Sequence, residues 1–315
     1  MVANRRRCPG SSRKVRSSGG ESRGIPRLWP LRGNVGHVNG SDQQHPDFDP
    51  LVVPISPAAT VMLLDDRPDL HVLMLRRTSN MVFAADNWVF PGGRVDPEDH
   101  AEHLDRLFSG LTDAEASDIL EVDRGGLAWW LAACRETLEE AGLLLAADHS
   151  DIDRAALRRE VEQDESVFAN LLLEHQLVLD ATAVEEVARF ITPVGSPRRF
   201  DARFFVARAP ANQEPVHDDG EIVDWTWVRP QDALDRWAAG AMTMMSPTVR
   251  MVACLARYSD ADDVMTAARR RQTYQRVRVI DPDGAYQVVL PGEPGYETAL
   301  LEIETGFVRL WDASH

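Results

Sequence analysis

The stretch RETLEEAG, residues 135–142, places four charged side chains within six positions, directly after the apolar segment GLAWWLAAC. Residues three and four apart are neighbours on a helix, so the pattern predicts a helix over residues 127–140. Its apolar stripe would consist of Leu127, Leu131, Cys134 and Leu138. Glu136, Glu139 and Glu140 fall together on another face. The glycine that closes the stretch is placed to end the helix in a left-handed conformation.

The three glutamates need an explanation, because like charges at these spacings destabilise a helix by about 0.2–0.5 kcal/mol per pair. A solvated helix face tolerates that cost, and Arg135 offsets part of it. A divalent cation would give the cluster a function, since Mg²⁺ or Mn²⁺ takes oxygen ligands from one or two carboxylates and completes its shell with water and substrate phosphate. The segment FPGG, Phe90 to Gly93, adds glycines that allow close backbone approach and leave a carbonyl free as a ligand.

The spacing of these two segments resembles the Nudix box, G-x5-E-x7-R-E-U-x-E-E-x-G-U, in which U is a bulky aliphatic residue. Gly93 opens the box and residues 135–143 match its second half, apart from Thr137 at an aliphatic position. The resemblance implies an α/β (α+β) fold, an α/β/α sandwich with a mixed sheet. It also implies a hydrolase that uses Mg²⁺ or Mn²⁺ to direct water at a diphosphate linked to another group.

The same resemblance assigns roles to individual residues. Glu139 and Glu140 would be metal ligands, and Glu136 would be a further ligand or the base that orients the attacking water. Arg135 would hold these carboxylates in place, and the carbonyl of Gly93 would add a backbone ligand. The expected catalytic residues are therefore Glu136, Arg135 and Glu139.

The chain departs from the box in its first acidic position and in its spacing. The first glutamate of the box aligns with Asp99, expected as a further metal ligand, although Asp96 and Glu98 lie close enough to fill the same position. Between Asp99 and Arg135 lie 35 residues where the box has seven, so an insertion of about 28 residues, around 100–126, interrupts it. Such an insertion is typical of the Nudix motif 19-like (RP2-like) branch, whose animal members are peroxisomal CoA and acyl-CoA diphosphatases.

The resemblance to this branch continues in ITPVGSPRRFDARFFVA, GEIVDWTWV and SPT, and it covers about residues 54–258. It implies cleavage of CoA or acyl-CoA to 3′,5′-ADP and (acyl-)phosphopantetheine. Arg198, Arg199 and Arg203 are candidates for binding the substrate phosphates, since guanidinium pairs with phosphate in a bidentate way. Surface arginines beside a strand are the more common alternative.

Two further residues are candidates for contacting the substrate. Arg77 fits the beginning of a separate CoA motif that precedes FPGG in other Nudix branches, but the later Arg and Gly of that motif are missing. Glu221 begins a strand after the acidic loop HDDG, and several Nudix enzymes draw an extra carboxylate from such a loop. A solvated strand end is the alternative for Glu221.

Three parts are expected along the chain. Residues 1–47 are rich in Arg, Ser and Gly without a hydrophobic period, which predicts disorder. Residues 48–258 would form the Nudix domain with its helical insertion, in which Thr112 and Glu115 have capping-box spacing. Residues 259–315 would form a small, β-like C-terminal extension. Further patterns predict strands over ATVMLL, HVLML, EIVDWTWV and RFFVA, and helices over PQDALDRWAAG and SPTVRMVACLARY.

Composition limits the classes of partner. The net charge of −16 argues against nucleic-acid binding, because phosphate-backbone recognition needs a basic face. No run of about 18 uncharged apolar residues occurs, so no membrane-spanning helix is expected. Cys8, Cys134 and Cys254 are too few for a disulfide framework and fit a cytoplasmic setting, with Cys134 as a small core residue. The expected partner is a small-molecule diphosphate, and the insertion and extension could build a lid or a homodimer interface.

Two other functions stay open on the sequence. One is an ADP-ribose or dinucleotide pyrophosphatase with the same metal chemistry. The other is a Nudix-fold module that senses a nucleotide without cleaving it. Such modules usually lose a box carboxylate, whereas all three glutamates are present here.

Overall fold

The structure is a computed structural model of the chain, and it describes residues 52–79, 85–101, 103–146, 152–194, 196–216, 220–271, 274–280, 287–299 and 301–311, with only the backbone of 301–305. All of these residues belong to the unit Arg32–His315, one of two into which the chain divides. The segment 1–47, predicted to be disordered, and Cys8 lie outside the described residues.

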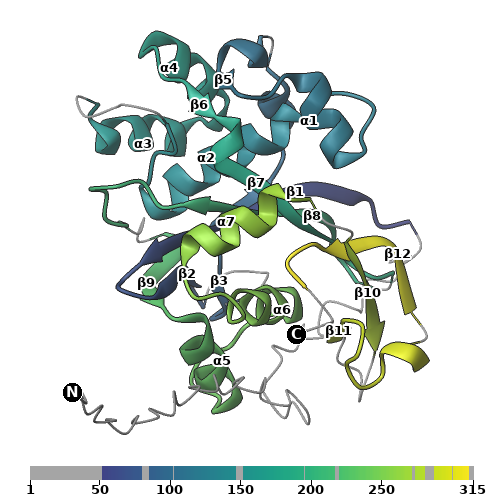
Figure 1. Cartoon of the computed structure of the whole chain (residues 1–315). Coiled ribbons are helices and arrows are strands. Elements are labelled where there is room, and N and C mark those ends of the chain that lie inside the picture. The colour runs from purple at the N-terminus through teal and green to yellow at the C-terminus, as the bar shows by residue number, and fades with distance from the viewer. Residues whose placement is uncertain are drawn as a thin grey trace, which may run out of the picture. The chain divides into compact units, whose positions relative to one another are not determined.

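A ten-stranded sheet runs through the described unit (Figure 1), in the order β11-β10-β12-β7-β8-β1-β2-β3, with β4 paired to β1 and β9 paired to β2. Its strands are β1 (Ile55–Asp66), β2 (Leu70–Arg77), β3 (Trp88–Val89), β4 (Gly92–Arg94), β7 (Val184–Ile191), β8 (Arg199–Arg208), β9 (Ile222–Val228), β10 (Gln275–Ile280), β11 (Gln287–Val289) and β12 (Leu301–Val308). β1 and β8 are parallel, and the other pairs are antiparallel. The sheet is therefore mixed, as predicted.

Helices cover both faces of this sheet. The first group is α1 (Asp113–Leu120), α2 (Leu127–Ala141), α3 (Arg154–Gln163) and α4 (Phe168–Glu174), and the second is α5 (Pro230–Ala238), α6 (Ser246–Leu255) and α7 (Ala261–Arg269). Figure 1 shows the first group on one side of the sheet and the second on the other. The predicted α/β/α class is confirmed.

Short elements complete the first layer. They are the 3-10 turns η2 (Pro97–His100), η3 (Leu104–Arg106), η4 (Glu165–Val167) and η5 (Ala181–Ala183), and a two-stranded sheet of β5 (Phe108–Ser109) and β6 (Leu179–Asp180). A further 3-10 turn, η7 (Tyr296–Thr298), lies in the C-terminal part. The insertion thus supplies η3, β5 and α1.

The predicted helix at RETLEEAG is α2, and its apolar stripe is buried as expected. Burial raises the pKa of Cys134 to about 12, in keeping with an inert core thiol. The indole N–H of Trp130 donates to the carbonyls of Ala181 and Val184, which ties α2 to the start of β7. Helix α2 also contacts α1, α3 and η2, so it is enclosed well beyond its apolar stripe. This packing excludes the alternative that the three glutamates form a solvated helix face.

Several local predictions are confirmed by the backbone. Gly142 ends α2 with φ of 65°, and Thr112 and Glu115 form the capping box that starts α1. Thr137, the departure from the aliphatic position, is fully buried, and its hydroxyl is satisfied because it donates to the carbonyl of Ala133 one turn earlier. Helices α3, α4 and α7 were not predicted.

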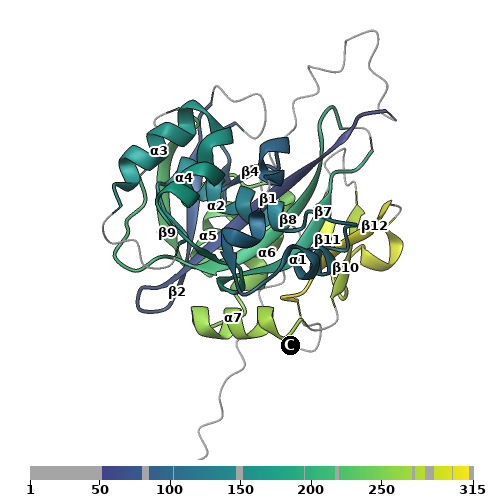
Figure 2. The ribbon, with the colours of Figure 1, turned by 90° about the horizontal axis from the view of Figure 1, so that it is seen from above.

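The segment after residue 273 continues the main sheet. β12 pairs antiparallel with β7, and β10 pairs with both β12 and β11. Figures 1 and 2 place these three strands at the edge remote from β9. Within the described part of the chain, no helix is both long and apolar enough to cross a membrane.

Candidate active site

The glycine pair of FPGG lies in β4, directly against α2. Gly92 and Gly93 pair with Thr60 and Ala59 of β1. A Cβ on Gly93 would overlap the carboxylate of Glu136, and a Cβ on Gly92 would lie 2.5 Å from the carbonyl oxygen of Ala59. Only glycine lets this strand approach both β1 and the helix, so the pair brings backbone groups against the carboxylates.

Arg135 is the centre of the hydrogen-bond network, with its side chain only 1% exposed. Its Nε and Nη2 donate to Asp99 at 3.1 and 2.9 Å, and Nη2 also donates to the carbonyl of Arg94 at 3.0 Å. Nη1 donates to Glu136 at 3.0 Å and to Glu139 at 3.2 Å. Burial opposes its charge, but the hydrogen bond to Asp99 and the neighbouring carboxylates outweigh burial and raise the pKa of Arg135. Arg135 therefore stays charged and fixes two glutamates.

Glu140 has a different set of partners. Its Oε2 accepts the backbone N–H of Gly92 at 2.9 Å, and its Oε1 lies 3.7 Å from Nη2 of Arg77. The same nitrogen lies 3.4 Å from Oε2 of Glu221. The structure thus brings two predicted substrate-contacting residues, Arg77 and Glu221, beside a predicted metal ligand.

The surroundings of Glu136, Glu139 and Glu140, from here the box glutamates, disfavour the charged form of these carboxyls. Burial raises the pKa of Glu139 to about 9, and the charge of Glu136 adds to the rise while Arg135 opposes it. Burial also raises the pKa values of Glu136 and Glu140, against the opposing effects of Arg135 on Glu136 and of Arg77 on Glu140. Without a cation, the site therefore favours the protonated form of these carboxyls.

The donor chemistry of the box glutamates fits a divalent cation. Oε1 of Glu139 is buried and has no hydrogen-bond partner among the described residues, so this oxygen is available to a ligand. Across the described ranges, no group of three or more acidic, histidine or cysteine side chains is arranged so that it could hold a metal ion. Arg135, the N–H of Gly92 and Arg77 engage other oxygens of the cluster. A cation would have to draw the carboxylates away from these partners.

Asp99, expected as a metal ligand, is used differently. Both of its oxygens accept hydrogen bonds from Arg135, and Oδ2 also accepts the backbone N–H of Asp96 at 2.9 Å. Asp96 itself reaches Arg135 only at 3.4 Å, and Glu98 is exposed. The geometry favours Asp99 for the first acidic position of the box. Because its lone pairs are directed at Arg135, we reassign Asp99 from ligand to anchor of Arg135.

Arg203, expected to contact substrate, lies in the core instead. Its side chain is 2% exposed, Nη1 lies 3.3 Å from Glu186, and Nη2 donates to the carbonyl of Leu120 at 2.7 Å. A guanidinium buried between β7 and the end of α1 cannot bind a substrate phosphate. This placement removes Arg203 from the substrate-binding candidates.

Arg198 and Arg199 lie at the start of β8, away from the box glutamates. Arg199 is paired with Ile55 of β1, whereas Gly93 is paired with Ala59, which lies four residues further along β1. At about 3.3 Å per residue this is roughly 13 Å along the strand. The two arginines therefore do not join the carboxylate cluster, and a contact with a distant part of a long substrate stays a prediction.

Two residues of the segment that follows α2 contact the site without having been predicted from the sequence. Oε2 of Glu165 lies 3.6 Å from Nη1 of Arg135, and its charge adds to the raised pKa values of Glu136 and Glu139. Arg158 donates to the carbonyl of Glu139 at 2.5 Å. The carbonyls at a helix C-terminus attract cations, which explains the contact of Arg158, but no local sequence signal indicates Arg158 or Glu165.

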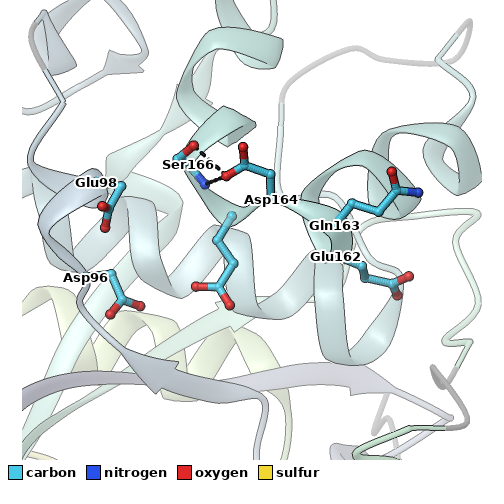
Figure 3. A pocket seen from close by; sticks show the side chains of 7 residues that line it. Asp96, Glu98, Glu162, Gln163, Asp164 and Ser166 are labelled. Atoms are coloured by element: carbon cyan, nitrogen blue, oxygen red, sulfur yellow. Dashed lines mark hydrogen bonds between the residues drawn. The ribbon is translucent and has the colours of Figure 1, made fainter.

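An acidic pocket of about 290 Å³ opens on this side of the site (Figure 3). Its lining residues are Asp96, Glu98, Glu162, Gln163, Asp164, Glu165 and Ser166. Five of these seven are carboxylates, so the pocket repels an anionic diphosphate.

Comparison with known proteins places this geometry in a family. A family model described as the NUDT19 Nudix domain matches residues 55–255. The chain belongs to this family. The predicted resemblance to the Nudix motif 19-like branch is thereby confirmed, and Nudix hydrolases generally use divalent metals, in agreement with the donor set.

Relatives and solved structures of Nudix proteins show the same likeness. The acyl-coenzyme A diphosphatase NUDT19 of Xenopus laevis is 25% identical over 236 residues, which cover 62% of each protein. The Gallus gallus protein of the same description is 26% identical over 279 residues, 72% of this chain and 73% of the relative. A NUDIX hydrolase from Alicyclobacillus acidocaldarius matches with a TM-score of 0.58 and 27% identity over 68% of this chain and 97% of that structure. The match thus spans less than two thirds of the Xenopus protein.

Proposed function

We propose that the chain is a Nudix hydrolase that uses Mg²⁺ or Mn²⁺ to cleave the diphosphate of CoA or acyl-CoA. The products would be 3′,5′-ADP and (acyl-)phosphopantetheine. The observation that carries the proposal is the clustering of the three box glutamates against the glycine backbone of β4, with Oε1 of Glu139 buried and without a hydrogen-bond partner among the described residues. The described activity of the NUDT19 relatives supports the substrate class.

Glu139, Glu140 and the carbonyl of Gly93 would hold the cation, which neutralises phosphate oxygens and lowers the pKa of water when bound. Arg135 orients Glu136 and Glu139 through Nη1. Water forms the new P–O bond, the bridging P–O bond breaks, and the water proton passes to a carboxylate, a role we give to Glu136. Arg77, which lies beside Glu140 and not beside Arg135, would contact the diphosphate.

The test is to incubate the wild-type protein, Glu139→Gln and Glu160→Gln with CoA, acetyl-CoA and ADP-ribose in the presence of Mn²⁺, and to identify products by mass. Glu160→Gln makes the same chemical change at an exposed position of α3. We expect CoA and acetyl-CoA to yield 3′,5′-ADP with wild type and with Glu160→Gln, and not with Glu139→Gln.

Two other outcomes would overturn parts of the proposal. Turnover of ADP-ribose alone would keep the metal chemistry and discard CoA as the substrate. Tight nucleotide binding without turnover of any compound would discard the hydrolase in favour of a nucleotide-sensing module.

A further inference from the structure

Arg77 closes β2 at the point where that strand meets the box glutamates. Its Nη2 lies 3.7 Å from Oε1 of Glu140 and 3.4 Å from Oε2 of Glu221. The side chain is only 17% exposed, yet its Nε has no hydrogen-bond partner among the described residues. The guanidinium is thus enclosed beside two carboxylates without a bidentate grip on either.

A β-bulge directs Arg77 and Glu221 to this position. Arg76 is paired with Asp224 on β9, but Arg77 is paired with Ile222, so the register skips one residue of β9. The carbonyl of Glu221 then accepts the N–H of Thr78 at 2.8 Å. Bulges are frequent next to active sites, where they redirect a side chain, and this one brings Arg77 and Glu221 together beside α2.

The contact between Arg77 and Glu140 competes with a cation. Glu140 uses Oε2 for the N–H of Gly92, so Oε1, the oxygen nearest Arg77, is the one left for a metal ion. A guanidinium at 3.7 Å repels a divalent cation that approaches the same oxygen. Cation binding at Glu140 is therefore weakened while Arg77 stays in its present position.

We propose that Arg77 is an exchangeable counter-ion. It stays with Glu140 and Glu221 while no divalent cation is bound, and it turns to a phosphate of the substrate when a cation takes over Glu140. The inference rests on the proposed function, since it needs both a cation at the box glutamates and a diphosphate beside it. It predicts that Arg77 opposes metal binding and favours substrate binding.

The test uses Arg77→Gln, with Mn²⁺ affinity measured by isothermal titration calorimetry without substrate and KM measured for acetyl-CoA. Losing the competing charge should tighten Mn²⁺ binding by about threefold, while losing the phosphate contact should raise KM by about tenfold or more. Arg76→Gln is the matched control, because Arg76 is the preceding residue and pairs with Asp224 at 3.8 Å. It should leave both quantities within about twofold of wild type. Arg77→Lys, which keeps the charge, should bind Mn²⁺ like wild type.

Tighter Mn²⁺ binding together with a higher KM in Arg77→Gln distinguishes this role from a structural one. If Arg77→Gln weakens Mn²⁺ binding or leaves it unchanged while KM rises, Arg77 is not a competing counter-ion. If the wild type binds Mn²⁺ and turns over acetyl-CoA, and Arg77→Gln does both equally well, the inference fails and the proposed function stands. A wild type that neither binds Mn²⁺ nor hydrolyses any tested substrate overturns both.

Discussion

Arg135 and Arg77 contact the same group of glutamates, but they are held in different ways. All three nitrogens of Arg135 donate hydrogen bonds, and its side chain is 1% exposed. Arg77 approaches its carboxylates through Nη2, is 17% exposed, and leaves Nε without a partner in the described part of the chain. One arginine is fixed in place and the other has donor capacity to spare.

The difference indicates two roles: Arg135 positions the carboxylates of the site, and Arg77 compensates the charge of one of them. Arg135 belongs to α2 itself and is anchored by Asp99 from the turn η2, so it fixes the positions of Glu136 and Glu139. Arg77 comes from the end of β2, next to a bulge, and faces Glu140. Arg135 therefore orients Glu136 and Glu139, whereas Arg77 compensates the negative charge of Glu140.

The largest effect is expected for Arg135→Met, which would leave the buried carboxylates of Asp99, Glu136 and Glu139 without their shared cation. Breaking a buried ion pair from one side costs about 3–5 kcal/mol, and we expect a loss of that order in the free energy of unfolding. Urea denaturation of metal-free protein would measure it. A loss below about 1 kcal/mol, typical of surface pairs, would contradict the fixed role of Arg135.

Asp99→Asn tests the anchor of Arg135 alone. The amide keeps the shape but removes the charge that Nε and Nη2 of Arg135 contact, so the free energy of unfolding should fall by about 1.5–3 kcal/mol. Asp96→Asn is the matched control, because Asp96 contacts Arg135 only at 3.4 Å, and it should cost less. Equal losses for the two variants would show that the anchor is not specific to Asp99.

Arg77→Met should have the smallest effect on stability, about 1 kcal/mol or less, because its longer contacts resemble those of an exposed pair. The same denaturation measurement applies, and acetyl-CoA turnover should still be impaired. A stability loss as large as that of Arg135→Met would erase the contrast between the two arginines.

The pH dependence of stability tests the charge imbalance of the site as a whole. Burial raises the pKa of Glu139 from 4.5 to about 9 and raises those of Glu136 and Glu140. These carboxyls bind protons more tightly in the folded state, so the metal-free protein should lose stability as pH rises from about 5 to 9. Urea midpoints at pH 6, 7.5 and 9 would show this, with a shallower fall for Glu139→Gln. A wild type and Glu139→Gln with parallel profiles would contradict it.

Both arginines and the three box glutamates were predicted from the sequence, but Glu165, which contacts Arg135, was not. The 3.6-residue period and the spacing of the box place Arg135 and the box glutamates on one helix, and the glycine pair predicts the close backbone approach. These features are local, so they can be read along the chain. Glu165 is brought to Arg135 by the packing of α3 on α2 and of η4 on η2, and no local pattern in the sequence indicates that contact.

The misassigned residues have a related cause. Arg203 and Phe204 are neighbours on β8, so their side chains lie on opposite faces of the sheet. The sequence alternation does not tell which of these faces the insertion covers. In the structure, α1 covers the face of Arg203 and supplies the carbonyl of Leu120. The geometry favours Asp99 for the first acidic position of the box, but the direction of its side chain depends on the turn η2, where it also accepts the N–H of Asp96. The sequence places both residues near the site without giving the orientation of their side chains.

The central claim is that the box glutamates form a divalent-cation site, and calorimetric titration of Mn²⁺ into metal-free protein tests it most directly. We expect wild type and Glu160→Gln to bind Mn²⁺ with equal affinity, and Glu139→Gln to bind at least about tenfold more weakly, since it loses a charged oxygen ligand. Equal Mn²⁺ affinity in wild type and Glu139→Gln would contradict the claim.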